Sequence, residues 1–363
     1  MNILIIGSNG FVAKNLIVRL KYLNFNLIHH LKSHGLESLK EKILKSNIIF
    51  YLAGVNRVTQ DKEYQKNIEL TKEIVKILKN TKKKIKIIFS SSTQVLKKNS
   101  YSYSKKKSEK ILLSISKKKN IKLIIFRLPN VFGKWAKPHY NSVVATFCHQ
   151  LTRGKKISIY SNRKLILLYI DDLIDEFLSL IRERKSNVLR EPKNTFKITV
   201  KELAIILRNF KNAVIGTNFE FSNKIIKNLY STYLSYLPNS KITHNLKLNK
   251  DIRGNFIELF KNKNSGQISY FSIKPGKIRG NHFHNTKTEK FLLLNGVVRV
   301  NFINIYDNKK FSIKVSENNP KIFITKPGYV HNIVNISKKD AKFVVWSNEI
   351  FDKDKPDTYK YII

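Results

Sequence analysis

The sequence predicts two folds in succession: an open α/β sheet with helices on both faces, and then a small all-β barrel. In residues 1–244, short apolar runs alternate with longer segments of helical period, which is typical of a doubly wound parallel sheet. In residues 245–363, short alternating runs are separated by turn signals, which indicates a barrel or sandwich. We therefore predict two domains, 1–244 and 245–363, with the boundary inside 241–248.

Length and composition agree with two folded domains and exclude several other classes. The chain has 363 residues, and a single core rarely grows beyond about 250–300 residues. Its 42% hydrophobic content suffices for packed cores, which excludes disorder as the main state. The single cysteine, Cys148, excludes a disulfide framework and indicates a reducing compartment, the cytoplasm. No apolar run reaches the length of a membrane helix, and the N-terminus does not resemble a signal peptide.

The net charge of +44 has three interpretations. It results from 69 Lys+Arg against 25 Asp+Glu, and such a balance is typical of nucleic-acid binding. The lysines are spread along nearly the whole chain, which indicates a compositional bias instead, and anionic small substrates are a third explanation. Because we find no recognition helix, zinc finger or aromatic–basic module, we expect neither a nucleic-acid partner nor a membrane partner.

Within the first domain, the apolar run 2–6 ends at Gly7, as a buried parallel strand would. From Gly10 to about Leu23 the apolar residues have helical spacing. Further strands are predicted at 27–31, 48–52, 85–89 and 123–126, with helices at 67–78 and 104–116 between them. This alternation of strand and helix is the basis for predicting a parallel sheet.

Within the second domain, we expect strands at 255–260, 267–273, 290–294, 297–303, 321–324 and 342–347. Turns rich in Gly, Pro and Asn separate them at 264–266, 274–276, 318–320 and 326–328. Short strands at this spacing are typical of a small barrel.

A Gly-rich turn follows the first strand and begins the first helix. Gly7 and Gly10 permit a tight turn and the close approach of a pyrophosphate, whose charge the helix N-terminus favours. An ordinary glycine turn is the alternative, but its position directly after the first strand favours a dinucleotide site. We predict that the cofactor contacts Gly7, Asn9, Gly10, Phe11 and Val12.

No Asp or Glu follows the second strand, where an acidic residue would bind the ribose of NADH. His29, His30 and Lys32 stand there instead, and a basic environment suits the 2′-phosphate of NADPH. We predict NADPH as the cofactor, with His30 and Lys32 near its 2′-phosphate. Surface lysines in a lysine-rich chain are the alternative interpretation.

A Tyr–Lys pair follows the serine-rich end of the fourth predicted strand. Tyr and Lys at i, i+4 share one helix face, so the ammonium can lower the pKa of the phenol. The phenol can then transfer a proton to or from a sugar oxygen, and a nearby Ser can hold that same oxygen. Two pairs compete, Tyr101 with Lys105 and Tyr103 with Lys107. The spacing alone does not choose between them.

These features resemble the extended short-chain dehydrogenase/reductases that act on nucleotide sugars. That family carries a Gly-rich turn, a serine-rich strand end and Tyr-x-x-Ser-Lys, which the Tyr101 pair completes with Ser104. Residues 127–133 and 169–172 resemble its next strand, its substrate loop and a later helix start. The resemblance implies that Tyr101 is the acid/base, that Lys105 positions the ribose and tunes Tyr101, and that Ser92, or alternatively Ser91, holds the substrate oxygen. The candidate substrate-binding residues are Asn130, Lys134, His139 and Asn141.

A second group of residues in the barrel has the composition of a metal site. His282 and His284 are at i, i+2 and would share one face of a strand, where Glu289 and His331 could join them. Three imidazoles and one carboxylate suit a divalent metal such as Zn²⁺. The spacing resembles the two cupin motifs, and residues 251–258 resemble the opening of sugar-nucleotide 3,5-epimerase cupins. Because those epimerases need not use metal, metal-free proton chemistry stays open.

The two halves together resemble a family of bifunctional capsular-polysaccharide enzymes of the UDP-N-acetyl-L-fucosamine pathway, most closely at 127–148 and 279–294. The resemblance implies C3 epimerisation of a UDP-2-acetamido-2,6-dideoxy-4-hexulose in the cupin. NADPH-dependent reduction of the C4 ketone would follow, giving a UDP-N-acetyl-6-deoxy-L-talosamine type sugar. It also implies a homodimer through the cupin. The epimerisation base is not identified, because Lys290 and Tyr329 beside the ligands are better explained as structural residues.

Two other functions remain as alternatives. One is an NAD(P)-dependent nucleotide-sugar epimerase or dehydratase whose cupin is only structural. The other is a nucleic-acid-binding regulator with a cofactor-sensing domain.

Overall fold

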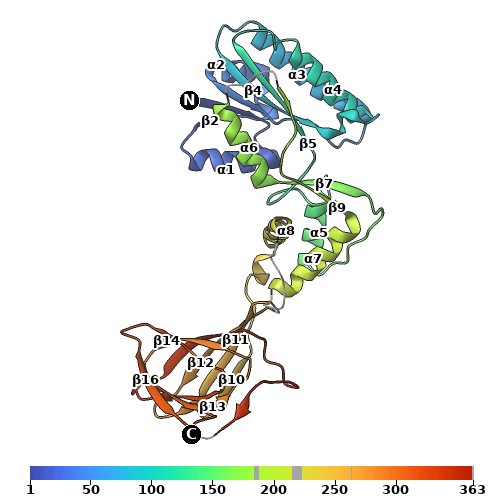
Figure 1. The fold of residues 1–363 in the computed structure, drawn as a ribbon. Helices are drawn as coiled ribbons and strands as arrows, with labels where there is room; N and C mark the ends of the chain where they lie inside the picture. Colours follow the sequence, from blue (N-terminus) through green and yellow to red (C-terminus); the bar gives the residue numbers. More distant parts are fainter. Residues whose placement is uncertain (184–187, 215–222, 263, 362–363) are drawn as a thin grey trace. The chain divides into compact units, whose positions relative to one another are not determined.

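The computed structural model describes residues 1–183, 188–214, 223–262 and 264–361. The chain divides into two compact units, Met1–Arg208 with Ser222–Pro238, and Asn209–Phe221 with Asn239–Ile363 (Figure 1). The domain limits 1–244 and 245–363 stay a prediction beside this division. Within the described ranges, every helix is too short or too polar to span a bilayer.

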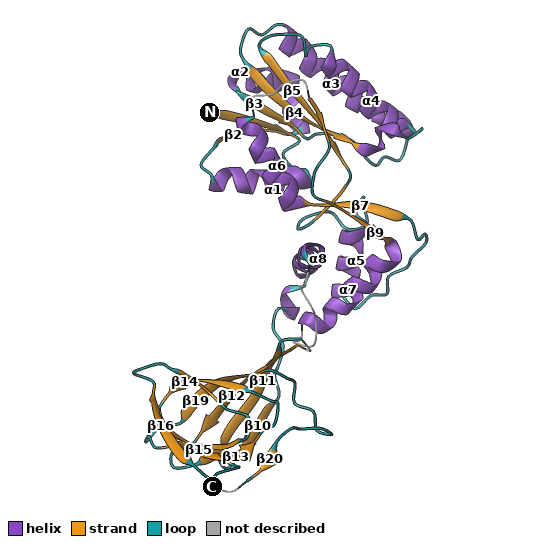
Figure 2. Cartoon of the chain, in the orientation of Figure 1, coloured by secondary structure: helices purple, strands orange, loops and turns teal. Residues whose placement is uncertain are grey.

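A parallel sheet forms the centre of the first unit (Figure 2). Its strands, in spatial order, are β2 (Asn26–His30), β1 (Asn2–Ile6), β3 (Ile48–Tyr51), β4 (Ile85–Ser92), β5 (Ile121–Leu128) and β8 (Val188–Arg190). The strand order reverses between β1 and β3, and at such a point parallel α/β sheets bind ligands beyond the carboxyl ends of their strands. The predicted doubly wound α/β fold is confirmed.

Side chains of the central strands alternate between two hydrophobic cores. Ile3 and Ile5 of β1 pack with α1 (Phe11–Tyr22) and α6 (Ile170–Arg182) on one face. Leu4 and Ile6 belong to the core on the other face, which contains residues of α2 (Gly35–Lys45), α3 (Gln65–Lys79) and α4 (Ser100–Leu113). Burial on both faces explains why these strands are continuous apolar runs in the sequence.

The helix α4 begins earlier than the predicted helix 104–116, and the reason is a cap. The side chain of Asn99 accepts a hydrogen bond from the amide of Ser102 at 2.8 Å, which satisfies one of the free amides at the helix start. The earlier start places Tyr101 inside the first turn of the helix. Short 3₁₀ turns precede or follow the other elements at Lys32–His34 (η1), Asp61–Tyr64 (η2), Thr93–Leu96 (η3) and Asn239–Lys241 (η4).

The later part of the first unit contains elements that the sequence did not predict. A small sheet joins β6 (Asn130–Phe132), β7 (Lys164–Tyr169) and β9 (Thr195–Thr199). Helices α5 (Val143–Thr152) and α8 (Lys224–Leu234) complete this part, and α7 (Val200–Val214) begins in it, with its residues from Asn209 assigned to the second unit. The helix start that the sequence suggested near Tyr169 is confirmed, because α6 begins at Ile170.

The second unit consists of two antiparallel sheets around an aromatic core. One sheet has the order β10 (Leu248–Asp251), β11 (Gly254–Asn262), β12 (Gly266–Ile273), β19 (Ala341–Ser347), β14 (Glu289–Asn295) and β17 (Ile322–Ile324). The other has the order β16 (Lys310–Ser316), β15 (Val297–Asn304), β18 (Tyr329–Asn335), β13 (Ile278–Phe283) and β20 (Tyr359–Lys360). Phe271, Phe291 and Phe343 pack between them, so the predicted all-β domain is confirmed as cupin-like.

Candidate active site and candidate metal centre

The carboxyl edge of the parallel sheet opens into a cleft of about 1450 Å³. Pockets for one small molecule occupy roughly 300–1,000 Å³, so this cleft has room for two ligands. Its lining comes from the Gly-rich turn, the loop after β3, the end of β4, the start of α4 and the loops after β5 and β6. The residues predicted as cofactor and substrate contacts that line it are Asn9, Gly10, Phe11, Val12, Ser92, Tyr101, Lys105, Asn130, His139 and Asn141.

The Gly-rich turn has the backbone that a dinucleotide site requires. Gly7 adopts φ +88°, and a Cβ added there would lie 2.7 Å from the backbone of Ala53, so only glycine fits. The amide of Gly10 donates to the carbonyl of Gly7 at 3.0 Å, and α1 begins at the next residue. No side chain caps the start of α1 and its first turn has no acidic residue, so its amides can bind a phosphate.

The end of β2 is basic through its lysines and not through His30. The His30 side chain is buried, and burial lowers the pKa of this imidazole to about 4, assisted by nearby Lys42 and His34. It is therefore neutral near pH 7, while its carbonyl accepts the amide of Gly7 at 3.0 Å. Lys32 lies exposed in the following 3₁₀ turn, and the Lys42 ammonium lies 2.8 Å from the Nδ1 of His34. Positive charge at this end comes from Lys32 and Lys42.

The structure distinguishes between the two Tyr–Lys pairs. Tyr101 lines the cleft and its hydroxyl forms a hydrogen bond with Ser92, whereas the side chain of Tyr103 is 62% exposed. Lys105 is buried one turn after Tyr101, and its ammonium donates to the carbonyl of Ser90 at 3.0 Å. Tyr101, Ser92 and Lys105 thus line the same cleft.

The pKa of Tyr101 is shifted in the opposite direction to the lowering that its pairing with Lys105 predicts. Burial raises the pKa of Tyr101, and only the hydrogen bond with Ser92 opposes it. Burial also lowers the pKa of Lys105, to about 8, although the Glu109 carboxylate opposes this change. The physical reason is that both groups lose water together, which disfavours phenolate and ammonium alike.

The neighbouring serine has a different partner. The Ser91 hydroxyl donates to Glu109 at 2.6 Å, and this carboxylate also accepts two hydrogen bonds from Arg127, at 3.0 and 2.7 Å. Glu109 is almost fully buried, so the pair is held inside the protein beside Lys105. Ser91 is thereby engaged by a carboxylate, and Ser92 is the serine that reaches Tyr101.

One of the four candidate substrate residues is engaged in a salt bridge. The Lys134 ammonium forms a salt bridge with both carboxylate oxygens of Asp171, at 2.7 and 2.8 Å. His139 lies in a left-handed conformation (φ 55°), and the loop that carries it is anchored by Arg57, whose guanidinium donates to its carbonyl at 3.3 Å. Asn130 and Asn141 line the cleft directly.

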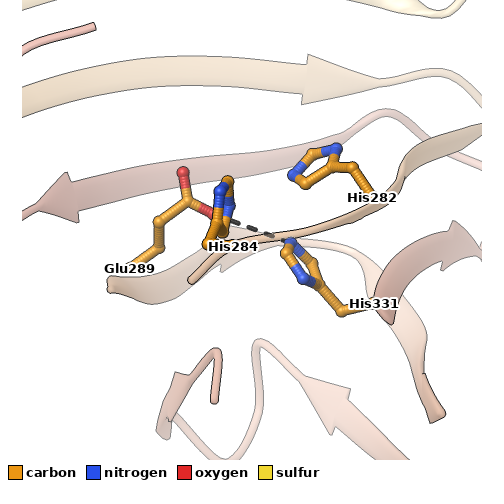
Figure 3. Close-up of side chains that lie close together, drawn as sticks. All are labelled: His282, His284, Glu289 and His331. Carbon is orange, nitrogen blue, oxygen red and sulfur yellow. Dashed lines mark hydrogen bonds and ion pairs between the residues drawn. The ribbon is translucent and has the colours of Figure 1, made fainter. Parts of the chain in front are cut away.

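The second unit brings four predicted ligands together, as Figure 3 shows. One donor atom from each of His282, His284, Glu289 and His331 lies within 4.8 Å of the others. A carboxylate oxygen of Glu289 lies 3.3 Å from the Nε2 of His284 and 3.6 Å from that of His331. β13 carries His282, His284 follows that strand directly, and β14 and β18 supply the other two.

The protonation states at this cluster suit a metal. Burial lowers the pKa of His282 to about 4, with help from His331, so the imidazole is neutral near pH 7. Burial would raise the pKa of Glu289, but hydrogen bonds from His284 and His331 hold it well below its usual value. Neutral imidazoles and an ionised carboxylate are the ligand forms that Zn²⁺ requires. The donor set therefore fits a tetrahedral divalent ion.

Family profiles match both units of the chain. The "NAD dependent epimerase/dehydratase family" matches residues 3–194, and the "Polysaccharide biosynthesis C-terminal domain" matches residues 249–359. A relative from Pseudomonas aeruginosa, "UDP-2-acetamido-2,6-beta-L-arabino-hexul-4-ose reductase", is 37% identical over 99% of this chain and 98% of its own. The chain belongs to the NAD dependent epimerase/dehydratase family.

Solved structures of family relatives agree with this assignment. The capsular polysaccharide assembling protein CapF from Staphylococcus aureus has a TM-score of 0.93 and 37% identity, with both chains covered completely. CapF with the inhibitor 3-isopropenyl-tropolone has a TM-score of 0.87 and 35% identity, again over both whole chains. UDP-N-acetylglucosamine 4-epimerase from Bacillus cereus, at 17% identity and TM-score 0.53 over 64% of this chain and 96% of its own, shows only the shared fold. The predicted resemblance to two-domain capsular-polysaccharide enzymes is confirmed.

Among the cationic residues that line the cleft, Arg57 and Arg163 were missed from the sequence. Arg57 lies in the loop after β3, and Arg163 directly precedes β7. Arg57 follows a parallel strand at its carboxyl end, where ligands of this family's fold bind, so its position was a usable signal. The sequence contained no such signal for Arg163, because the strand that follows it, β7, was not predicted.

The structure also places the two residues that flank the metal ligands. The Lys290 ammonium lies 5.3 Å from the centre of the Trp346 ring, and both residues alternate with inward-facing neighbours on paired strands. Lys290 therefore points to the opposite face of the sheet from Glu289. Tyr329 is two residues before His331 on β18, so it shares that ligand's face and packs against the core.

Proposed function

We propose that this protein reduces the C4 ketone of a UDP-2-acetamido-2,6-dideoxy-hexulose, using NADPH, after its cupin unit has epimerised C3. The observation that carries the reductase proposal is the meeting of Tyr101, Ser92 and Lys105 at the carboxyl edge of a dinucleotide-type sheet. The name of the relative from Pseudomonas aeruginosa, a reductase of a UDP-linked 4-hexulose, supports the substrate class.

Each residue of the cleft has a distinct task in this proposal. The nicotinamide, when bound, supplies a hydride to C4. The Ser92 hydroxyl donates a hydrogen bond to the ketone oxygen, and the Tyr101 hydroxyl gives its proton to that oxygen as the alcohol forms. A neutral phenol is the form that must give this proton, and the raised pKa of Tyr101 keeps it protonated. Lys105 holds the ribose and stabilises the tyrosinate that remains.

The cupin unit supplies the earlier step in this proposal. The C3 proton is acidic only while C4 is a ketone, so epimerisation must precede reduction. A divalent ion held by His282, His284, Glu289 and His331 would supply a Lewis acid for the enolate that forms when this proton is removed. The orientation of Lys290 toward the opposite face counts against it as the base, and Tyr329 shares the face of His331.

Product analysis tests the two steps separately. The protein is incubated in deuterated water with a 4-keto-UDP-N-acetylhexosamine, with and without NADPH, and the products are examined by NMR. We expect deuterium at C3 in both cases, and a C4 alcohol with consumption of NADPH only when NADPH is present. If bound cofactor is recycled without net consumption, the protein is an epimerase or dehydratase with a structural cupin.

The choice of NADPH rests on the basic end of β2. Lys32 and Lys42 provide positive charge there, and none of the residues of β2 is acidic. This positive charge stabilises the bound 2′-phosphate of NADPH, whereas the ribose hydroxyl of NADH finds no carboxylate there to accept its hydrogen bond. Dissociation constants for NADPH and NADH, measured by protein fluorescence, test this choice, and equal values would contradict it.

A homodimer through the cupin is supported by the outer face of its larger sheet. Side chains alternate along strands, so the neighbours of buried Phe271 and Phe343 point outward. Strand register aligns these outward side chains in one apolar row across five strands: Ile257, Tyr270, Val344, Leu292 and Ile322. Apolar rows of this extent mark interaction sites. Light scattering should show a dimer that Val344→Glu converts to monomer, whereas Lys314→Glu, at an exposed position of the other sheet, leaves it intact.

A further inference from the structure

The C-terminal segment, defined here as residues 351–361, lies beside the candidate metal centre. Its strand β20 pairs with β13, so that Lys360 faces His282 and Tyr359 faces Phe283. The rings of Phe283 and Tyr359 stack at 5.2 Å, and the amide of Tyr361 donates to the carbonyl of Asn281 at 2.9 Å. The end of the chain is thereby fixed to the strand that carries the first ligand.

Within this segment, the Asp357 side chain holds the loop that joins two ligands. Its carboxylate accepts hydrogen bonds from three consecutive amides, those of Asn285 at 3.1 Å, Thr286 at 2.8 Å and Lys287 at 2.8 Å. The hydroxyl of Thr286 adds a fourth bond at 3.1 Å. These residues connect His284 to Glu289, and bonds to an ionised carboxylate are stronger than bonds between neutral groups. One side chain thus holds three of the four residues between the two ligands, and Asn348 holds the fourth, Thr288.

The backbone of Asp357 acts on a ligand directly. Its carbonyl oxygen lies 2.6 Å from the Nδ1 of His284, and a carbonyl can only accept, so Nδ1 must carry the proton. A metal would then bind the free electron pair of Nε2, the nitrogen that lies 3.3 Å from Glu289. The Nδ1 of His331, by contrast, is buried with no hydrogen-bond partner among the described residues. Asp357 thus fixes the tautomer and the ring orientation of His284 in particular.

The backbone conformation at Asp357 agrees with a position under constraint. Its φ is +32°, a left-handed value that a residue other than glycine adopts only when its surroundings enforce it. The five hydrogen bonds made by its carbonyl and carboxylate supply that enforcement.

We propose that Asp357 is a positioning residue of the cupin centre, which orients His284 through its carbonyl and holds the loop 285–287 through its carboxylate. The group it serves is a divalent cation, so the proposal rests on the metal site proposed above. Partners of this kind around metal-bound histidines change metal affinity by roughly 10–100-fold when they are removed.

Zinc affinity of the full-length protein tests the role of the carboxylate. Zn²⁺ is titrated into metal-free protein in competition with a chromogenic chelator, for the wild type, Asp357→Ala and Asp354→Ala. Asp354 is an exposed aspartate of the same segment and serves as the matched control. We expect Asp357→Ala to weaken Zn²⁺ binding by about 10–100-fold and Asp354→Ala to leave it unchanged. Equal affinities in the two folded variants would overturn the proposal.

The tautomer of His284 provides a second test that needs no metal. In ¹⁵N-histidine-labelled protein, long-range ¹H–¹⁵N spectra show which ring nitrogen carries the proton, and His284→Ala identifies the signals. We expect a proton on Nδ1 in the wild type and also in Asp357→Ala, which keeps the backbone carbonyl, so that a loss of Zn²⁺ affinity in this variant is assigned to the carboxylate. A wild-type Nδ1 without a proton would contradict the proposal. If the wild type binds no Zn²⁺ but shows the Nδ1 tautomer, the proposed metal function fails while the role of Asp357 stands.

Discussion

The two units build their sites in opposite ways. In the first unit, a wide cleft of about 1450 Å³ is lined by side chains from many separate loops. In the second, four side chains carried by or next to three strands lie within 4.8 Å of one another. The cleft of the first unit needs its ligands to complete it, because burial raises the pKa of Tyr101 and lowers the pKa of Lys105, which disfavours the charged form of each. A cluster of the second kind is already organised by its own hydrogen bonds.

The comparison predicts that the two chemistries can be separated by single substitutions. The largest effect is expected for Tyr101→Phe, which removes the proton donor and lowers kcat of the reduction by roughly 10²–10⁴-fold. The measurement is NADPH oxidation with the 4-keto substrate. Tyr103→Phe is the matched control, because Tyr103 is largely exposed on the same helix. C3 exchange with solvent deuterium should persist in Tyr101→Phe, and its loss would show that the two sites are not independent.

The complementary substitution, which affects epimerisation and not reduction, is in the cupin unit. His282→Ala removes one of four candidate ligands, and we expect Zn²⁺ affinity and C3 deuterium exchange to fall by more than roughly 100-fold, since even indirect partners contribute 10–100-fold. Reduction of a substrate that has already been epimerised should continue at the wild-type rate. His244→Ala, outside the cluster, is the control. Unchanged exchange in His282→Ala would favour metal-free proton chemistry.

The four residues of the cluster in the second unit were all predicted from the sequence, whereas the residues of the cleft in the first unit were predicted only in part. His282, His284 and Glu289 are close in the chain, so their spacing was visible in the sequence. Arg57 and Arg163 are far apart in the chain and line the same cleft only in the folded protein, and the strand after Arg163 was not predicted. Lys134 was assigned to substrate because it lies on the right loop, but nothing in the sequence showed its pairing with Asp171.

The pKa of Tyr101 also could not be predicted from the sequence. The spacing of Tyr101 and Lys105 correctly places both on one helix face, but the sign of the effect on Tyr101 depends on burial. Burial is a property of the packed cleft, where Tyr64 and Tyr140 lie near Tyr101 and add to the rise in its pKa. Periodicity thus gives the direction of a side chain, and only the three-dimensional surroundings give its charge state.

Stability should also differ between the two units. Glu109 of α4, the helix that carries Tyr101, forms a buried salt bridge with Arg127 of β5, and removing one partner of such a pair costs about 3–5 kcal/mol. We expect Glu109→Ala to destabilise the first unit in urea unfolding while the transition of the cupin stays in place. Glu41→Ala breaks an exposed pair with Lys45 and should change little. A shift of both transitions in Glu109→Ala would show that the units unfold together.

The smallest effect, and the one specific to the open cleft, is expected in the pH dependence of reduction. Burial lowers the pKa of Lys105 to about 8, so its ammonium is present below this pH and is lost as the pH rises through it. Because kcat/KM reports groups of the free enzyme, we expect it to decline above about pH 8, by up to roughly tenfold for each pH unit. Lys105→Arg keeps a positive charge and should move this decline to higher pH, whereas Lys107→Arg, exposed on the same helix, should not. Glu109→Gln should move the decline to lower pH, because that carboxylate supports the ammonium. A kcat/KM that stays flat from about pH 7 to about pH 10 would remove Lys105 from the chemistry and leave it only a structural role in the cleft.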